Sequence, residues 1–198
     1  MNKDYLFTKL LIKLNLMITN YKDYTIEVIN DSEHTVGNVD NLRNYSKVYT
    51  SNLSHENCKH GIIIKQNDEI ISSAIICEIG ISMRILENSF LIKNDSIFIC
   101  CERKIYSLAI PELNLNWSIE CDLATCFGIH EFEDDFIIHG ETEISRLTER
   151  GLIKWQFNGR DIFVTMDGQK DFEIIGNTIK LKDFENNDYI LNGNGNEI

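Results

Sequence analysis

Histidine and cysteine residues gather at two places in this sequence, and both residue types bind zinc. The first place is the polar segment HENCKH, which contains His55, Cys58 and His60. The second is CDLATCFGIH, residues 121–130. Zinc requires three or four such ligands in a tetrahedral arrangement, and neither spacing matches a zinc finger. We therefore expect no metal and no other cofactor. His55, Cys58 and His60 stand as candidate ligands, with the alternative that the histidines lie in a solvated loop and the cysteine faces the core.

The segment DDFIIHGE, residues 134–141, contains groups that could act as acid and base. His139 and Glu141 could transfer protons, and Asp134 could supply a further carboxylate. Gly140 would let a ligand approach the backbone closely. Acidic residues are also common in hairpin turns, which would explain them without any function. His139, Glu141 and Asp134 are therefore the candidate catalytic residues, against a purely structural alternative.

No other motif in the sequence carries recognisable chemistry. The segment DFENND, residues 183–188, resembles a calcium loop, but Asp188 stands where such a loop needs glycine, so we predict a hairpin turn. The sequence contains no glycine-rich phosphate loop, no nucleophile elbow and no dinucleotide fingerprint.

The charge balance argues against two classes of partner. The 198 residues include 19 basic and 31 acidic side chains, a net charge of −12. Nucleic acids and anionic membranes attract clustered lysine and arginine, which this sequence lacks. No apolar run is long enough to span a bilayer and no secretion signal is recognisable, so we expect a cytoplasmic protein with reduced cysteines. An acidic surface suits a basic protein partner, although it also keeps proteins soluble.

Two stretches of the sequence repeat one another. Residues 94–119 and 133–157 align with a single one-residue gap. The matched pairs include Asp95 with Asp134, Ile99 with Ile138, Leu108 with Leu147, and Trp117 with Trp155. Each copy reads as three strands separated by turns, and a further short apolar strand precedes it, at 89–92 or 126–129. Four strands joined by hairpin-length connections predict an antiparallel meander.

Weaker copies flank this pair. Strands at 161–164, 172–175, 178–184 and 189–191 are expected downstream, followed by a frayed end, NGNGNE, at 192–197. Strands at 61–64 and 69–77 are expected upstream. Residues 14–30 could form a pair of strands, although Leu6, Leu10, Leu14 and Met17 would equally suit an amphipathic helix. We favour a short helical or frayed start that runs into β structure from about residue 14. Residues 30–60 predict a long irregular connection, and such connections are often functional.

Many of the expected strands are apolar at consecutive positions, as in GIII, IFICC, FIIHG and FEII. That pattern is typical of sheets covered on both faces. We therefore predict an all-β fold of repeated four-stranded antiparallel meanders in a small or incomplete β-propeller-like architecture. The alternative is a β-sandwich of curled meanders. An N-terminal segment with a hairpin and a long polar loop (1–58) and a repeated region (59–198) are expected to form one domain.

Residues 134–157 resemble a blade of the quinoprotein-type β-propeller repeat, the kind found in pyrroloquinoline quinone dehydrogenases. The positions that match its glycine, leucine, glycine and tryptophan pattern are Gly140, Leu147, Gly151 and Trp155. The preceding copy keeps Trp117 but has Cys101 in place of the first glycine. The resemblance covers residues 60–191 and implies that Trp117 and Trp155 pack between neighbouring blades. It implies nothing specific about activity, and at this length it implies four or five blades without a quinone.

Two classes of function fit these features. Repeats without catalytic motifs, an acidic surface and a long polar loop indicate a non-catalytic binding or scaffold module with a protein partner or a small ligand. One form would be a bacterial immunity or inhibitory protein that neutralises a basic toxin. The alternative is a hydrolase that acts on a sugar or small molecule in a cleft at the blade ends, using His139 and Glu141.

Overall fold

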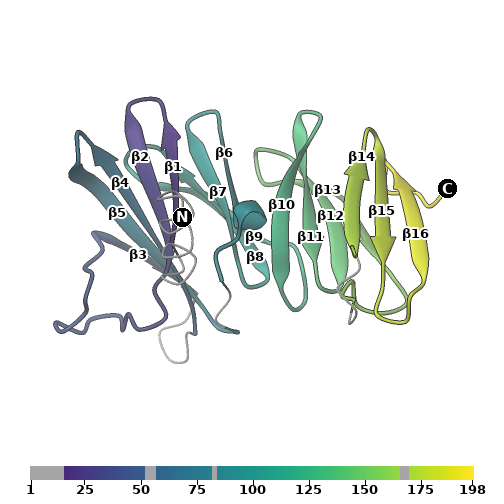
Figure 1. The fold of residues 1–198 in the computed structure, drawn as a ribbon, viewed down its shortest axis with the longest axis horizontal. Coiled ribbons are helices and arrows are strands. Elements are labelled where there is room, and N and C mark those ends of the chain that lie inside the picture. The colour runs from purple at the N-terminus through teal and green to yellow at the C-terminus, as the bar shows by residue number, and fades with distance from the viewer. Residues whose placement is uncertain (1–15, 52–56, 82–83, 166–169) are drawn as a thin grey trace, which may run out of the picture. The chain divides into compact units, whose positions relative to one another are not determined.

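The computed structural model describes residues 16–51, 57–81, 84–165 and 170–198. These residues form sixteen β-strands and one short 3-10 helix, η1 (Glu87–Ser89), with no α-helix among them. The strands belong to four separate sheets, which Figure 1 shows with their strands labelled. The predicted all-β fold class is confirmed.

Two of the sheets are four-stranded meanders of consecutive strands. Sheet II contains β6 (Phe90–Lys93), β7 (Ser96–Cys101), β8 (Lys104–Ala109) and β9 (Leu115–Glu120). Sheet III contains β10 (Cys126–Phe132), β11 (Asp135–Gly140), β12 (Glu143–Leu147) and β13 (Ile153–Asn158). These are the two copies that the sequence repeat predicts, and the predicted meanders are confirmed.

Burial along the strands explains the runs of consecutive apolar residues. Every residue of β11 is buried, as is every residue of β7 after Ser96. The edge strand β13, and β9 from Asn116 onward, instead alternate between exposed and half-buried residues. A strand covered on both faces needs apolar side chains at successive positions, whereas an edge strand that is wet on one face does not. The both-face burial expected from the sequence therefore holds for the inner strands of each meander.

Sheet I has five strands in the order β1-β2-β4-β5-β3. They are β1 (Leu16–Tyr21), β2 (Tyr24–Asn30), β3 (Lys47–Thr50), β4 (Cys58–Gln66) and β5 (Glu69–Glu78). The predicted strand pair over 14–30 is present as β1 and β2, while the helical alternative falls mostly on residues 1–15, outside the described residues. The irregular connection predicted over 30–60 is wrong at β3, which pairs in parallel with β5, and at the first residues of β4.

Sheet IV has three strands, β14 (Phe172–Ile175), β15 (Thr178–Lys182) and β16 (Asp188–Asn192). The strand predicted at 161–164 is wrong, because this segment is irregular and only Phe163 within it is fully buried. The turn predicted at 167–168 lies outside the described residues. The frayed end predicted at 192–197 is also wrong. Leu191 bridges to Glu197, and the amide of Ile198 donates to the Ile190 carbonyl at 2.9 Å.

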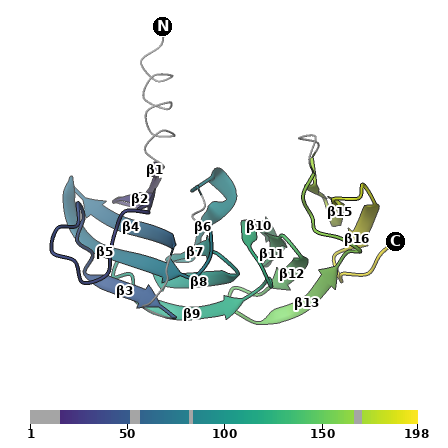
Figure 2. The same ribbon diagram turned by 90° about the horizontal axis from the view of Figure 1, so that it is seen from below.

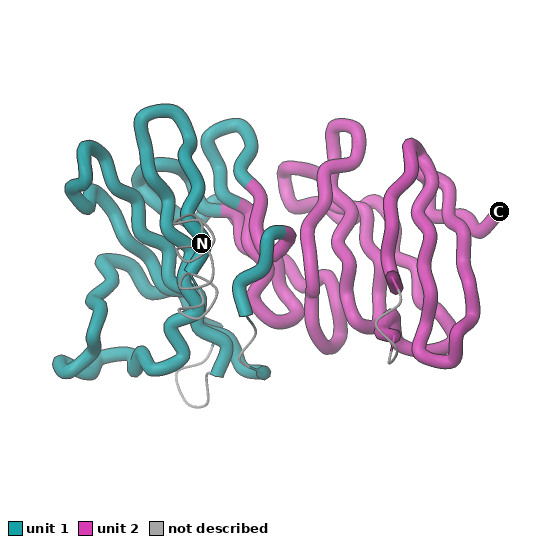
Figure 3. Tube along the Cα trace, in the orientation of Figure 1, with its two compact units in different colours: residues 1–87, 92–97, 108–116 teal, residues 88–91, 98–107, 117–198 magenta. Residues whose placement is uncertain are grey.

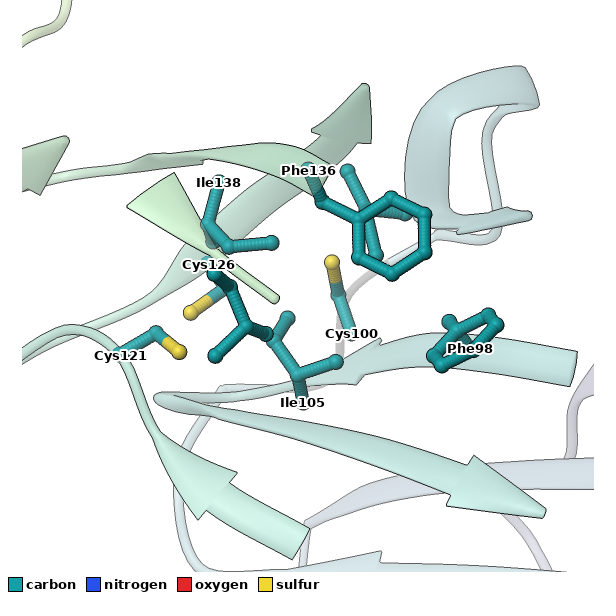
Figure 4. Packing of buried hydrophobic residues seen from close by; sticks show 9 residues of the cluster. Phe98, Cys100, Ile105, Cys121, Cys126, Phe136 and Ile138 are labelled. Atoms are coloured by element: carbon teal, nitrogen blue, oxygen red, sulfur yellow. The ribbon is translucent and has the colours of Figure 1, made fainter. Parts of the chain in front are cut away.

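The chain divides into two compact units, coloured in Figure 3. Unit 1 contains residues 1–87, 92–97 and 108–116, and unit 2 contains residues 88–91, 98–107 and 117–198. Two apolar clusters form the core of unit 2. The first packs Phe98, Cys100 and Ile105 against Phe136 and Ile138 and is drawn in Figure 4. The second joins sheets III and IV through residues that include Ile137, Ile144, Phe163, Phe172, Ile179, Tyr189 and Leu191.

Candidate functional site

The structure places His139 inside the packing between sheets III and IV. Its side chain is only 8% exposed, and its ring stacks on Phe172 with 4.5 Å between the centroids and an interplanar angle of 12°. Phe127 meets the same ring edge-on at 5.4 Å. One ring nitrogen bonds to the Phe163 backbone, while Nε2 has no hydrogen-bond partner among the described residues.

This setting keeps the imidazole of His139 neutral. Burial, reinforced by the neighbouring His130, lowers the pKa of His139 to about 3, and the bond to Phe163 opposes that shift only in part. Burial alone lowers the pKa of His130 to about 4. A general base works best when its pKa lies near the working pH. A buried, stacked imidazole with so low a pKa is a poor acid–base group.

The other two candidate catalytic residues are not assembled around His139. Asp134 lies in the turn before β11, at the opposite end of that strand, about 16 Å from His139 at the usual rise per residue. Glu141 follows β11 and its backbone joins two neighbouring segments. Its amide donates to the Thr125 carbonyl at 2.8 Å, and its carbonyl accepts from the Phe163 amide at 2.7 Å. Among the described residues, no hydrogen bond or ion pair joins the carboxylate of Asp134 or Glu141 to the imidazole, and the arrangement does not resemble a working acid–base site.

Gly140 lies against a buried carboxylate. A Cβ atom at this position would come 2.2 Å from Oδ2 of Asp122 and 2.6 Å from the carbonyl oxygen of Glu143. Asp122 is 1% exposed. It accepts hydrogen bonds from the amides of Ala124, Thr125, Thr142 and Glu143 and from the hydroxyl of Thr142. The missing side chain at Gly140 thus makes room for a carboxylate that joins two segments of unit 2, residues 122–125 and the hairpin of residues 140–143.

Trp117 and Trp155 occupy matching environments in unit 2. The indole nitrogen of Trp117 donates to the Glu149 carbonyl at 3.1 Å, and its ring covers Gly151. The indole nitrogen of Trp155 donates to the Gly193 carbonyl at 3.1 Å, and its ring covers Gly195. Both glycines have left-handed backbones, with φ of +79° and +78°. Each tryptophan of one meander thus lies on a glycine turn of the next segment.

Two of the three candidate metal ligands lie side by side at the start of β4. The Sγ atom of Cys58 is 3.5 Å from Nε2 of His60, and both residues are buried. His55 lies outside the described residues. The pair supplies two of the three or four ligands that a zinc ion requires.

The loop of residues 31–46 forms a cluster of polar groups on sheet I that the sequence reading did not single out. The hydroxyl of Tyr45 donates to Oδ2 of Asp31 at 2.8 Å, and its ring lies where a Cβ of Gly61 would stand. Burial and this hydrogen bond raise the pKa of Tyr45. His34 packs edge-on against Tyr45 at 5.2 Å, and its Nδ1 atom is buried without a hydrogen-bond partner among the described residues. These contacts hold both ends of the loop on the sheet.

The tip of the same loop exposes two apolar side chains. Val39 and Leu42 are each 88% exposed, more than any other large apolar residue that the structure describes. The only sequence signal for them was their position in a polar segment that reads as a long connection. The loop can be followed in violet and blue at the left of Figures 1 and 2.

Comparisons with known proteins bear on the fold. No protein-family model matches the sequence, and no curated protein sequence matches it. The chain is similar to the computationally designed Ika4 protein, with a TM-score of 0.53, 6% identity and coverage of 88% of each chain. It is also similar to the dihydro-heme d1 dehydrogenase NirN in complex with DHE, with a TM-score of 0.51 and 10% identity. The match with NirN covers 93% of this chain and 43% of that one.

A third similar structure is the WD40 domain of Neurospora crassa Pan2, with a TM-score of 0.44 and 10% identity. That match covers 56% of this chain and 36% of the Pan2 chain. The chain therefore spans less than half the length of both natural proteins. Likeness at such low identity shows the fold alone. The fold is β-propeller-like, as predicted, whereas the more specific quinoprotein type remains a prediction. Among the described residues, no helix has the length and apolar character needed to cross a membrane.

Proposed function

We propose that this protein is a non-catalytic module that binds a basic protein partner. The observation that carries the proposal is the ordered loop 31–46, which displays Val39 and Leu42 almost fully to solvent in a chain of net charge −12. Binding residues are disproportionately found on loops that a rigid scaffold positions. An acidic surface favours encounter with a basic partner over other proteins.

The candidate catalytic groups support the same proposal by their placement. His139 is stacked and buried, Asp134 lies at the other end of β11, and the Glu141 backbone joins neighbouring segments. A hydrolase using His139 and Glu141 would need the imidazole to reach a substrate, but that ring is 8% exposed. One concrete form of the binding proposal is a cytoplasmic immunity or inhibitory protein from a bacterial conflict system, with an acidic surface that covers a basic toxin.

The proposal is tested by affinity purification from extracts of the source cells, with the full chain as bait. We expect one protein rich in lysine and arginine to be retained saturably and released when the salt concentration is raised, because exposed charge pairs weaken with ionic strength. An unrelated protein of similar size and net charge serves as the control bait. Retention of the same proteins by both baits, or of none by this one, would refute the proposal.

A further inference from the structure

We propose that the tip of the loop 31–46 is the element that enters the partner, and that the partner presents an apolar pocket bordered by basic side chains. The inference rests on the proposed protein-binding function and specifies its site and the chemistry of its partner.

The loop tip has an apolar pair that folding leaves uncovered. Val39 and Leu42 are both 88% exposed, so they contribute almost no burial to the folded chain. Single exposed apolar residues are common on protein surfaces and by themselves indicate little. Here the two lie three positions apart on one short segment, and covering them would remove apolar surface from water on binding.

The tip is held in one conformation by its own polar groups. The Asn41 side chain accepts from the Thr35 amide and donates to the carbonyls of Thr35 and Asn38, each at 2.8 Å. The Asn38 side chain accepts from the Asp40 amide at 3.0 Å. Gly37 supplies the left-handed residue that the turn needs, with φ of +79°. A segment that is ordered before binding loses less conformational entropy on association, so its apolar contacts yield more affinity.

The base of the loop is anchored to the sheet as well. The Lys59 ammonium donates to the His34 carbonyl at 2.6 Å, and the Ser46 hydroxyl donates to the Ser73 carbonyl at 2.6 Å. With Tyr45 fixed on Gly61 by Asp31, both ends of the loop are fastened. The tip is therefore an ordered projection from the sheet and not a flexible connection.

Charge at the tip decides the kind of pocket that can receive it. Asp40 is exposed and lies between Val39 and Leu42 in the sequence, and Glu33 is exposed elsewhere in the same loop. The one basic residue of the loop, Arg43, turns back toward the Asp31 carboxylate, 3.8 Å away. The charged residues that the loop exposes, Glu33 and Asp40, are thus acidic, while the Arg43 charge is paired, and this balance matches a pocket with lysine or arginine at its rim.

Site-specific photo-crosslinking tests the inference in the source cells. The full chain carries p-benzoylphenylalanine at position 39 or, as the control, at position 152, where Leu152 is 65% exposed in a turn of unit 2. We expect position 39 to give an adduct with one basic protein, and position 152 to give none. Excess wild-type chain should suppress the adduct, while the Val39→Ser/Leu42→Ser variant should not.

Binding of the crosslinked protein is then measured with purified components. Val39→Ser/Leu42→Ser should weaken binding by at least about tenfold, as expected when central apolar anchors are truncated. Leu152→Ser should leave binding unchanged. Asn41→Ala keeps both apolar side chains but removes the hydrogen bonds by which Asn41 orders the tip. It should weaken binding without changing the melting temperature of unit 2.

The possible failures are distinguishable. Equal adducts from positions 39 and 152, an acidic crosslinked protein, or wild-type affinity in the double variant would each overturn the inference. In those cases a partner retained by the wild-type bait would still support the proposed function. If the bait retains nothing and position 39 gives no adduct, both proposals are wrong.

Discussion

Replacing Gly140 with alanine should destabilise unit 2 strongly, although glycine-to-alanine changes in ordered backbone often stabilise proteins by about 0.4–1 kcal/mol. The new Cβ would lie 2.2 Å from Oδ2 of Asp122, so the carboxylate must move. Five hydrogen bonds between 2.6 and 3.1 Å hold that carboxylate in place. A hydrogen bond to a charged group contributes about 1.5–3 kcal/mol. Losing one or two of them should lower the free energy of unfolding by about 1.5–6 kcal/mol.

The assay follows from the position of the tryptophans. The chain has two tryptophans, and Trp117 and Trp155 both belong to unit 2, so tryptophan fluorescence during denaturant or thermal unfolding reports on this unit. For a chain of this length, a loss of about 3 kcal/mol corresponds to a melting temperature lowered by roughly 6–12 °C.

Gly140→Ala in an Asp122→Ala background identifies the cause. Removing the carboxylate relieves the closest contact, so the alanine should be less destabilising there than in the wild type, and the difference measures the coupling between the two positions. The Glu143 carbonyl, 2.6 Å from the added Cβ, will keep the rescue partial. A Gly140→Ala variant within about 0.5 kcal/mol of the wild type would refute this account of the glycine.

Three further predictions concern unit 2 and the thiols. Burial lowers the pKa of His139 to about 3 and that of His130 to about 4, from the ordinary 6.5. Below pH 6.5 these two histidines are therefore protonated in the unfolded chain but remain neutral in the folded chain. The free energy of unfolding should therefore fall between pH 6.5 and 5, by up to about 2 kcal/mol per histidine, and a His139→Gln/His130→Gln variant with the wild-type slope would contradict this. Gly195→Ala should destabilise unit 2 more than Gly176→Ala, and should shift the tryptophan emission. Both glycines have positive φ, but only a Cβ at Gly195 meets Trp155, at 2.5 Å, and equal effects would rule out that contact. All six cysteines are buried thiols, and burial raises the pKa of Cys121 to about 12, so Ellman's reagent should label them in denaturant but scarcely in the native protein. Rapid native labelling of several thiols would contradict the buried cores.

The meanders were predictable because their determinants are local. Both residues of the turns Asn67-Asp68 and Asn94-Asp95 have positive φ, as two-residue hairpin turns of type I′ require. Turns of this type have a characteristic sequence, so they can be predicted. The error at 161–164 has a different origin. Phe163 satisfies the apolar pattern by inserting one ring into the core of unit 2, while its amide bonds to the Glu141 carbonyl outside any sheet. An apolar run shows that burial is needed, but not that a strand provides it.

The candidate site was less predictable, because its groups meet through contacts distant in sequence. The pattern HGE at 139–141 places an imidazole beside a carboxylate in the chain, but the stacking partner of His139, Phe172, lies 33 positions away. The ordered tail was missed for the same reason. Nothing in NGNGNE indicates that the Trp155 ring covers Gly195 or that Arg146 donates to the Gly193 carbonyl at 2.7 Å.

The topology of sheet I explains why the loop 31–46 lies where it does. In the sheet order, β4 and β5 separate β2 from β3, so the chain leaving β2 must cross both strands, a span of about 14 Å at the usual strand spacing. The crossing is made on one face of the sheet, where Gly61 of β4 leaves room for Tyr45 and Ser73 of β5 bonds to Ser46. The span needs only part of the sixteen-residue connection. The remaining residues form the loop tip that carries Val39 and Leu42 and that the Asn41 side chain holds by hydrogen bonds. A Gly61→Ala substitution should therefore release the loop from the sheet, because its Cβ would come 2.1 Å from the Tyr45 hydroxyl. Hydrogen exchange should then increase over residues 31–46 and not in sheet III, and unchanged protection in the loop would show that Tyr45 does not anchor it.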